Sequence, residues 1–254
     1  MRKFGKLKQM EGSFEHCGVH HVMIPNGGYL LHQAHYTRQL HPLPEDEIRG
    51  WQDYRPVPPR LASPYVSLVC AMAWMLLTVP SVAVYISYLQ RHLKEPHARH
   101  VKDANRVLRF LKAKQHSVAY NKLTGNLKLV AVSDSAFHAG ETDGLATRGA
   151  FVLLAAMDGQ RTPGGQVHLL DWVSKKQSHV CRATFSAELF ASLDAANLAL
   201  KIASVMAEVV LGPHAGQQAC RSAGVWFFPD RLAPLHGRKE RRHGRGVHRA
   251  REGI

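Results

Sequence analysis

The sequence has few cysteines and no pairing among them. The four cysteines, Cys17, Cys70, Cys181 and Cys220, are scattered, and none belongs to a C-x-x-C pair. This spacing favours neither a disulfide framework nor a zinc finger, and is typical of reduced thiols in an intracellular protein of the cytoplasm or nucleus. Cys17 precedes His20 and His21, but no second ligand pair follows at finger spacing, so an ordinary solvent-facing His pair is expected there.

Acidic residues are also scarce. The chain has 19 Asp and Glu against 33 Lys and Arg, which gives a formal net charge of +14. Such a balance favours a polyanionic partner, nucleic acid first and an acidic membrane second, while simple solubility is the alternative. Hydrophobic residues make up 45% of the chain, enough for a core in one large domain or two smaller ones. The opening MRKFGKLKQMEG has no apolar core behind its basic residues, so no signal peptide is expected.

Charge is missing altogether from residues 65–90. The stretch is long enough to span a bilayer. Basic residues flank it on both sides, so the charges give no preferred orientation in a membrane. Pro80 interrupts it, however, and predicts two helices of about 14 and 12 residues, lengths typical of buried helices in soluble proteins. A membrane anchor at residues 65–90 stays open as an alternative.

The rest of the first half alternates between turn signals and one clear helix. HHVMIPNGGYLLHQ predicts a hairpin with Asn26, Gly27 and Gly28 at its turn. Residues 41–64 hold six prolines and predict a linker or an extended surface segment. Residues 96–120 predict an amphipathic helix with an apolar stripe and a basic side, which is either solvated or available to a phosphate backbone. The stripe consists of Val101, Ala104, Val107, Leu108 and Leu111, and the basic side of Arg99, Lys102, Arg106 and Arg109.

From residue 126 the pattern changes to strands and then to a long helix. Residues 126–133, 149–157 and 167–174 predict three strands, the last two joined as a hairpin. Residues 183–211 predict a helix whose small side chains Ser192, Ala195 and Ala199 share a side with Glu188. The core stripe of this helix is expected to be Phe185, Leu189, Leu193, Ala196 and Leu200. The predicted fold is α/β (α+β), with three antiparallel strands and a helix preceded by a helical region.

Two carboxylates stand out in this second half. Asp134 is expected at the C-terminal end of the first strand, and Glu188 in the first turns of the long helix. A central strand and an adjacent helix can bring such residues together, and facing carboxylates suit Mg²⁺, which prefers hard oxygen ligands. Two unrelated surface acids are the alternative.

Several motifs of residues 60–205 resemble copia-type retrotransposon polyproteins. The stretch from Tyr65 to Tyr120 resembles the segment that follows the polymerase core in that family. LVAVSDSAFHAGETDGLATRGAFVLLA is similar to the family's "GYSDADWAGD…STSGYVFLL". DWVSKKQSHVCRATFSAELFASLDAANLAL is similar to "SWKSKKQ.TVALSSTEAEYMALSEA". Residues 4–43 more faintly resemble the end of the reverse transcriptase.

The resemblance implies an RNase H domain, which cleaves the RNA strand of an RNA–DNA hybrid. Asp134 matches the family's first catalytic acid and Glu188 the second, while Ser186 replaces a non-catalytic Glu. Two-metal hydrolysis with Mg²⁺ or Mn²⁺ is implied, with Lys175, Lys176 and Arg182 on the hybrid backbone. The implied organisation is a reverse-transcriptase end and linker (1–60), a connection region (61–125), an incomplete RNase H-like domain (126–212) and a basic tail (213–254). Other parts of the parent polyprotein are implied partners.

The resemblance also has gaps. Asp230 is the candidate for the third acid, 42 residues after Glu188, but Pro229 precedes it and no helical pattern follows. No match to a fourth acid exists, and the polymerase motif Y-x-D-D is absent. Residues 231–254 contain eight Lys or Arg and two Glu, a composition typical of disorder, and we hypothesise a frameshift after about residue 212. An impaired nuclease fragment, a noncatalytic nucleic-acid-binding remnant and a membrane-anchored protein are the competing interpretations.

Overall fold

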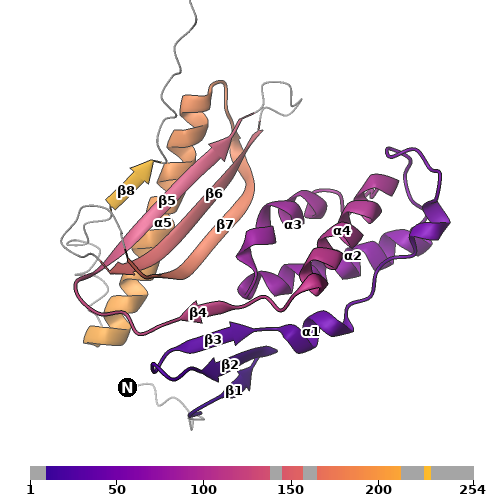
Figure 1. The fold of residues 1–254 in the computed structure, drawn as a ribbon. Coiled ribbons are helices and arrows are strands. Elements are labelled where there is room, and N and C mark those ends of the chain that lie inside the picture. The colour runs from indigo at the N-terminus through magenta and orange to yellow at the C-terminus, as the bar shows by residue number, and fades with distance from the viewer. Residues whose placement is uncertain (1–9, 138–144, 157–164, 213–225, 230–254) are drawn as a thin grey trace, which may run out of the picture.

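The protein combines two β-sheets with a set of helices (Figure 1). The computed structural model describes residues 10–137, 145–156, 165–212 and 226–229. Mixed α and β structure was predicted, and the order of its elements confirms this coarse class. The first sheet and α1–α4 are built from residues 10–120, and the second sheet and α5 from residues 127–229.

The first sheet has the strand order β1-β2-β3-β4 and is antiparallel throughout. Its strands are β1 (Phe14–His16), β2 (Val19–Met23), β3 (Tyr29–His32) and β4 (Val118–Tyr120). The predicted hairpin is confirmed, because β2 pairs with β3 across a turn in which Gly27 has a φ of +78°. The side chain of Asn26 accepts a hydrogen bond from the Gly28 amide at 3.1 Å, a contact that fixes this turn.

The uncharged stretch forms two helices, as Pro80 predicts. The chain runs from α2 (Pro59–Trp74) through short 3₁₀ turns at Met75–Leu77 and Pro80–Val82 into α3 (Ala83–Gln90). By length and composition alone, Pro59–Leu77 and Thr184–Leu211 could each cross a membrane, which is weak evidence because core helices pass the same test. Tyr65 and Met72 of α2 are fully buried, and the Tyr65 hydroxyl donates to the Leu89 carbonyl of α3 at 2.8 Å.

The amphipathic helix predicted over residues 96–120 is confirmed as α4 (Ala98–Ala113), and its predicted stripe is buried. Its predicted C-terminal end is wrong, because Val118–Tyr120 form strand β4.

The prediction of a linker or an extended surface segment over residues 41–64 is wrong in part, because residues 59–64 form the first turns of α2. The remaining proline-rich segment, residues 41–58, is not a free linker. It contains the 3₁₀ turn Glu45–Ile48, follows α1 (Ala34–Gln39), and contributes Leu43, Ile48 and Val57 to the core formed by α2–α4. Residues 34–113, from α1 to the end of α4, therefore pack as one helical unit rather than as a linker followed by helices.

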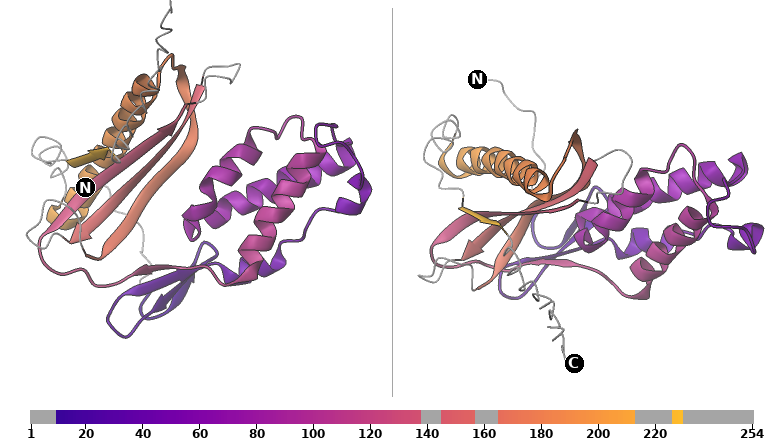
Figure 2. Two further views of the ribbon diagram at one scale, coloured as in Figure 1. Left: turned by 45° about the horizontal axis from the view of Figure 1, so that its top comes forward. Right: turned by 90° about the horizontal axis from the view of Figure 1, so that it is seen from above.

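The second sheet has the strand order β7-β6-β5-β8. Strands β5 (Leu127–Ala136), β6 (Leu145–Ala156) and β7 (Val167–Val180) are antiparallel, so the three predicted strands and their pairing are confirmed. The fourth strand, β8 (Trp226–Pro229), runs parallel to β5 on its open side. Helix α5 (Thr184–Leu211) connects β7 to this strand and covers one face of the sheet (Figures 1 and 2).

The predicted core stripe of α5 is wrong. Phe185, Leu189 and Leu193 are 78%, 57% and 57% exposed. The side chains that contact the sheet are instead the buried small ones, Ala187, Ala191, Ala195 and Ala199. Ala195 and Ala199 pack with Ala131, Ala150 and Val152 of the sheet. Small residues on both surfaces let helix and sheet approach closely, so the larger stripe is turned outward.

Candidate functional site

Asp134 lies in a groove between the second sheet and the start of α3. The groove has a volume of about 270 Å³. Pro80, Ser81 and Val84 form one wall, and Asp134, Thr147, Phe151 and Trp172 belong to the sheet side. Phe151 and Trp172 are direct cross-strand neighbours in β6 and β7, and Phe151 is 45% exposed. The groove therefore presents one carboxylate beside an aromatic surface.

Three contacts join the second sheet to the helical unit and to the first sheet. Arg91, which follows α3, donates to the hydroxyl of Thr147 at 2.8 Å. Tyr120 of β4 donates its hydroxyl hydrogen to the Leu169 carbonyl of β7 at 2.8 Å. Trp172 also packs against the core of the helical unit. These contacts fix the position of α3 relative to β6 and β7, so the groove is a fixed feature of the fold.

Glu188 lies on the other face of the sheet. It belongs to the second turn of α5, one turn before Ser192, whose hydroxyl is 3.2 Å from that of Ser133. Because successive side chains of a strand point to opposite faces, Ser133 faces α5 while Asp134 faces the groove. Both acids lie near the same end of β5, but on opposite sides of the sheet.

This arrangement does not fit one metal ion held by both acids. Carboxylate oxygens are the ligands that Mg²⁺ and Mn²⁺ prefer, yet the sheet separates these two. In the part of the chain that the structure describes, no group of three or more His, Cys, Asp or Glu side chains could hold a metal ion, and this includes the surroundings of Cys17, His20 and His21.

Asp230, the candidate third acid, lies outside the described residues. The residue before it, Pro229, ends β8 and pairs with Ser133 of β5. A fourth strand, β8, therefore precedes Asp230 and runs beside β5, the strand that carries Asp134, although these residues were predicted to belong to the basic tail.

The predicted nucleic-acid contacts divide between the two faces. Lys176 pairs in register with Thr147 on the groove side. Lys175 pairs with Arg148, whose guanidinium forms an ion pair with Asp194 of α5. Lys175 therefore shares the α5 face, and Arg182 is exposed immediately before α5. Only Lys176 of the three predicted residues lies on the same face as Asp134.

Sequence reasoning missed a polar layer beneath the first turns of α5. Besides the Ser133–Ser192 pair and the Arg148–Asp194 ion pair, Gln177 donates to the Ala187 carbonyl at 2.7 Å. Burial lowers the pKa of Arg148, because its charged form loses contact with water. Gln177 immediately follows the Lys175–Lys176 pair, but no pattern in the sequence marked Gln177 as buried or Arg148 as partly buried.

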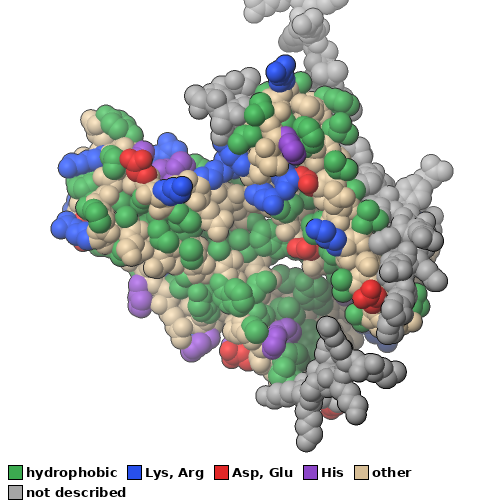
Figure 3. Space-filling view, turned by 180° about the vertical axis from the view of Figure 1, so that it is seen from behind, with side chains coloured by type: hydrophobic (Ala, Val, Ile, Leu, Met, Phe, Trp, Pro, Cys, Tyr) green, Lys and Arg blue, Asp and Glu red, His purple; other side chains and the backbone are tan. Residues whose placement is uncertain are grey.

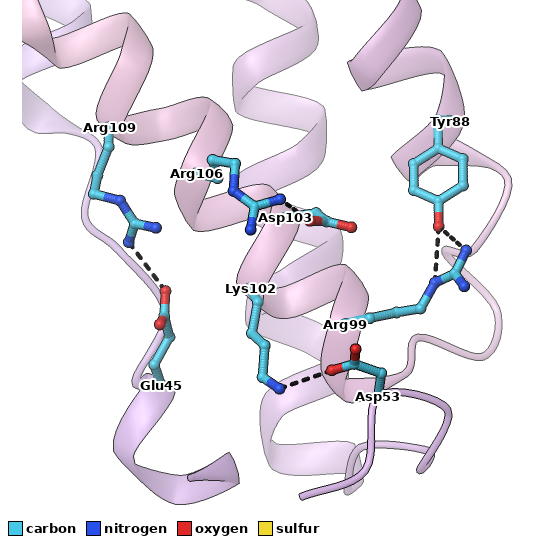
Figure 4. A network of polar contacts seen from close by, with 8 residues as sticks. All are labelled: Glu45, Asp53, Tyr88, Arg99, Lys102, Asp103, Arg106 and Arg109. Atoms are coloured by element: carbon cyan, nitrogen blue, oxygen red, sulfur yellow. Dashed lines mark hydrogen bonds and ion pairs between the residues drawn. The ribbon is translucent and has the colours of Figure 1, made fainter. Parts of the chain in front are cut away.

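The basic side of α4 is largely neutralised within the chain. Arg109 contacts Glu45 at 3.2 Å, Lys102 contacts Asp53 at 2.8 Å and Arg106 contacts Asp103 at 2.8 Å (Figure 4). Arg99 donates to the hydroxyl of Tyr88. These are exposed pairs that contribute little to stability, but they reduce the charge that α4 offers to a phosphate backbone.

Lys and Arg side chains remain numerous on the surface. Figure 3 shows them gathered over the upper part of the helical unit and toward the sheet, whereas the lower part shows mainly His and apolar side chains. Lys and Arg side chains are therefore unevenly distributed over this face.

The chain matches no protein-family model, and no match was found among curated proteins or solved structures. The fold, the groove and the motifs of the sequence are therefore the features that bear on its function.

Proposed function

We propose that this chain is a fragment of a copia-type retrotransposon polyprotein whose RNase H-like domain binds nucleic acid but is impaired in hydrolysing RNA. The observation that carries the proposal is the topology of the second sheet. Three antiparallel strands are followed by a helix and then by a strand parallel to the first. The motif acids fall on this framework in the implied order: Asp134 on the central strand, Glu188 on the helix, and Asp230 directly after the fourth strand.

The impairment follows from the position of the acids. Hydrolysis of a phosphodiester by two metal ions needs carboxylates that converge on one point. Asp134 and Glu188 lie on opposite faces of the sheet, and the sequence offers no match to a fourth acid. We therefore expect binding without efficient cleavage.

The groove supports nucleic-acid binding by its composition. A base or sugar can stack on the aromatic surface formed by Phe151 and Trp172, and such stacking is tolerant of sequence. Arg91 and Lys176 lie on the same side of the sheet, where a cation can neutralise a phosphate. Asp134 opposes this binding, since a carboxylate repels a phosphate.

The test compares two neighbouring lysines on opposite faces. Lys176→Glu is expected to weaken binding of a short labelled RNA–DNA hybrid about tenfold and to reduce the slope of log affinity against log salt by about 1. Lys175→Glu makes the same change of charge on the α5 face and is the matched control, expected to change both quantities much less. Fluorescence anisotropy over a salt series measures both. Equal effects of the two variants would remove the groove as the binding face, and absent or salt-independent binding would contradict the proposed function.

Cleavage of the same hybrid is measured in parallel with Mg²⁺ or Mn²⁺. We expect no cleavage above the uncatalysed background, and unchanged binding by Glu188→Gln. Metal-dependent cutting that disappears in Asp134→Asn would instead identify an active nuclease and refute the impairment.

A further inference from the structure

The outer side of α5 carries an apolar surface that the described structure leaves exposed. Leu189 and Leu193 are each 57% exposed, and Val210 is 74% exposed. Phe185 and Leu211, at the two ends of the helix, are 78% and 75% exposed. Monomeric proteins rarely leave a contiguous apolar patch of more than a few hundred Å² in contact with water. Figure 2 shows α5 lying on one face of the second sheet, so this outer side of the helix is turned away from the sheet.

The spacing along this side is that of a helix packed against another helix. Positions three and four residues apart alternate, and all are apolar. In order they are Leu189, Leu193, Ala196, Leu200, Ala203, Ala207 and Val210. An average spacing of 3.5 residues keeps one stripe facing a second helix along its whole length. We call this stripe the α5 seam.

The α5 seam is complementary to itself when it is reversed. Antiparallel pairing centred on Leu200 sets Leu189 opposite Val210 of a second copy, Leu193 opposite Ala207, and Ala196 opposite Ala203. Every layer is then apolar, and the layer of Leu193 sets a large side chain against a small one, which suits close helix packing. The helix has 28 residues, about 42 Å at 1.5 Å per residue, so the contact is long enough for a stable interface.

Two other partners for the α5 seam fit less well: the C-terminal residues of the same chain and a lipid bilayer. Residues 230–254 lack an apolar stripe of comparable length and are dominated by Arg, Gly and His. A lipid bilayer cannot surround α5, because Ala187, Ala191, Ala195 and Ala199 are fully buried and helix and sheet pack there. The helix also carries the charged side chains of Glu188, Lys201 and Glu208. Charges in the core of a bilayer are costly.

We infer that the protein forms an antiparallel homodimer through the α5 seam. The interface is isologous, with the two-fold axis at Leu200, so each copy contributes the same surface. This inference does not depend on the proposed function, because it involves the side of α5 away from the sheet.

The test measures the oligomeric state of the full chain by light scattering and sedimentation over a concentration series. The wild type is expected to be a dimer. Leu193→Glu sets two carboxylates in the seam, one from each copy, and is expected to raise the dissociation constant at least about 100-fold. Val205→Glu is the matched control: Val205 is 61% exposed on the same helix but outside the seam, so this variant is expected to remain a dimer. Far-UV circular dichroism verifies that both variants are folded.

Cysteine cross-linking tests the antiparallel register. In a background with Cys17, Cys70 and Cys220 replaced by serine, the double variant Ala196→Cys with Ala203→Cys is expected to form a disulfide-linked dimer. Either substitution alone is expected to leave the chains unlinked, because each position lies opposite the other one. Cross-linking of Ala196→Cys alone would indicate a parallel pair and overturn the register. A monomeric wild type, or flotation with anionic vesicles that Leu193→Glu abolishes, would overturn the dimer.

Discussion

Replacement of Asn105 by leucine is expected to lower the free energy of unfolding of the helical unit by about 3 kcal/mol. Asn105 is 1% exposed on α4. Its side-chain oxygen accepts from the Leu43 amide at 2.8 Å, and its side-chain nitrogen donates to the Leu43 carbonyl at 2.8 Å. The same nitrogen donates to Glu45 at 2.9 Å.

The size of this effect comes from the groups that the substitution leaves behind. Leu43 is 6% exposed, so its amide and carbonyl would lose their partner where water cannot replace it. Each buried group without a partner costs about 1–3 kcal/mol. Glu45 would also lose the strongest of the contacts that lower its pKa, the hydrogen bond from Asn105, while keeping its contact with Arg109.

Urea titration followed by tryptophan fluorescence measures the change through the shift in the transition midpoint at constant slope. Asn126→Leu makes the same substitution at an exposed position and is expected to stay within about 0.5 kcal/mol of the wild type. If Asn105→Leu also stays in that range, Asn105 does not hold segment 41–58 on α4.

The same contact explains what the sequence could not predict about the first half of the chain. The six prolines of residues 41–64 indicate extended backbone, and much of the segment has no regular structure. Nothing local, however, pairs Leu43 with Asn105, which is 62 residues away. Two residues of the basic side of α4 also have partners that are distant in sequence, since Arg109 contacts Glu45, 64 residues away, and Lys102 contacts Asp53, 49 residues away. Periodicity therefore predicted the helix and its buried stripe, but not which segment covers it.

In the second half, periodicity predicted every long element and failed on the orientation of one. Helix α5 carries two stripes at helical spacing, one of alanines and one of larger side chains. Hydrophobicity favours the larger stripe as the core, but close approach to the small residues Ala131 and Ala150 selects the alanines. At the candidate site, the strand around Asp134 was predictable, but the side of the sheet that Asp134 faces was not. The side of the sheet that each residue faces depends on where α5 packs, and adjacent residues such as Ser133 and Asp134 face opposite ways.

Acidification is expected to destabilise the helical unit through His100. Its side chain is 1% exposed at the start of α4 and stacks on His92, with ring centroids 3.9 Å apart. Nδ1 accepts from the His97 amide at 2.9 Å. Nε2 is buried and has no hydrogen-bond partner among the described residues. Burial first, and then the nearby charges of His92, Arg99 and His97, lower the pKa of His100 to about 4.

The direction of the pH dependence follows from this lowered pKa. Well above pH 6.5 the imidazole is neutral in both the folded and the unfolded chain, so His100 does not reduce the free energy of unfolding there. Between about pH 6.5 and pH 4 the unfolded chain binds a proton that the folded chain cannot, and stability falls as the pH falls. The difference between an ordinary pKa of about 6.5 and a folded pKa of about 4 corresponds to about 3 kcal/mol. The buried partners of His100 bring no carboxylate to compensate, since its ring neighbours are His92, His97 and Tyr88.

Urea titrations at a series of pH values, on the wild type and on His100→Gln, measure this contribution. Glutamine can still accept the hydrogen bond from the His97 amide but does not titrate. The variant is therefore expected to be less stable than the wild type at neutral pH and to lose about 3 kcal/mol less on acidification to pH 4. His41→Gln, at an exposed position, is the control and is expected to follow the wild type. Comparison with this control separates the effect of His100 from the general effect of adding positive charge to a basic chain. Parallel curves for the wild type and His100→Gln would mean that the unfolded and folded chains protonate His100 alike, and hence that the ring is not held in a dry environment.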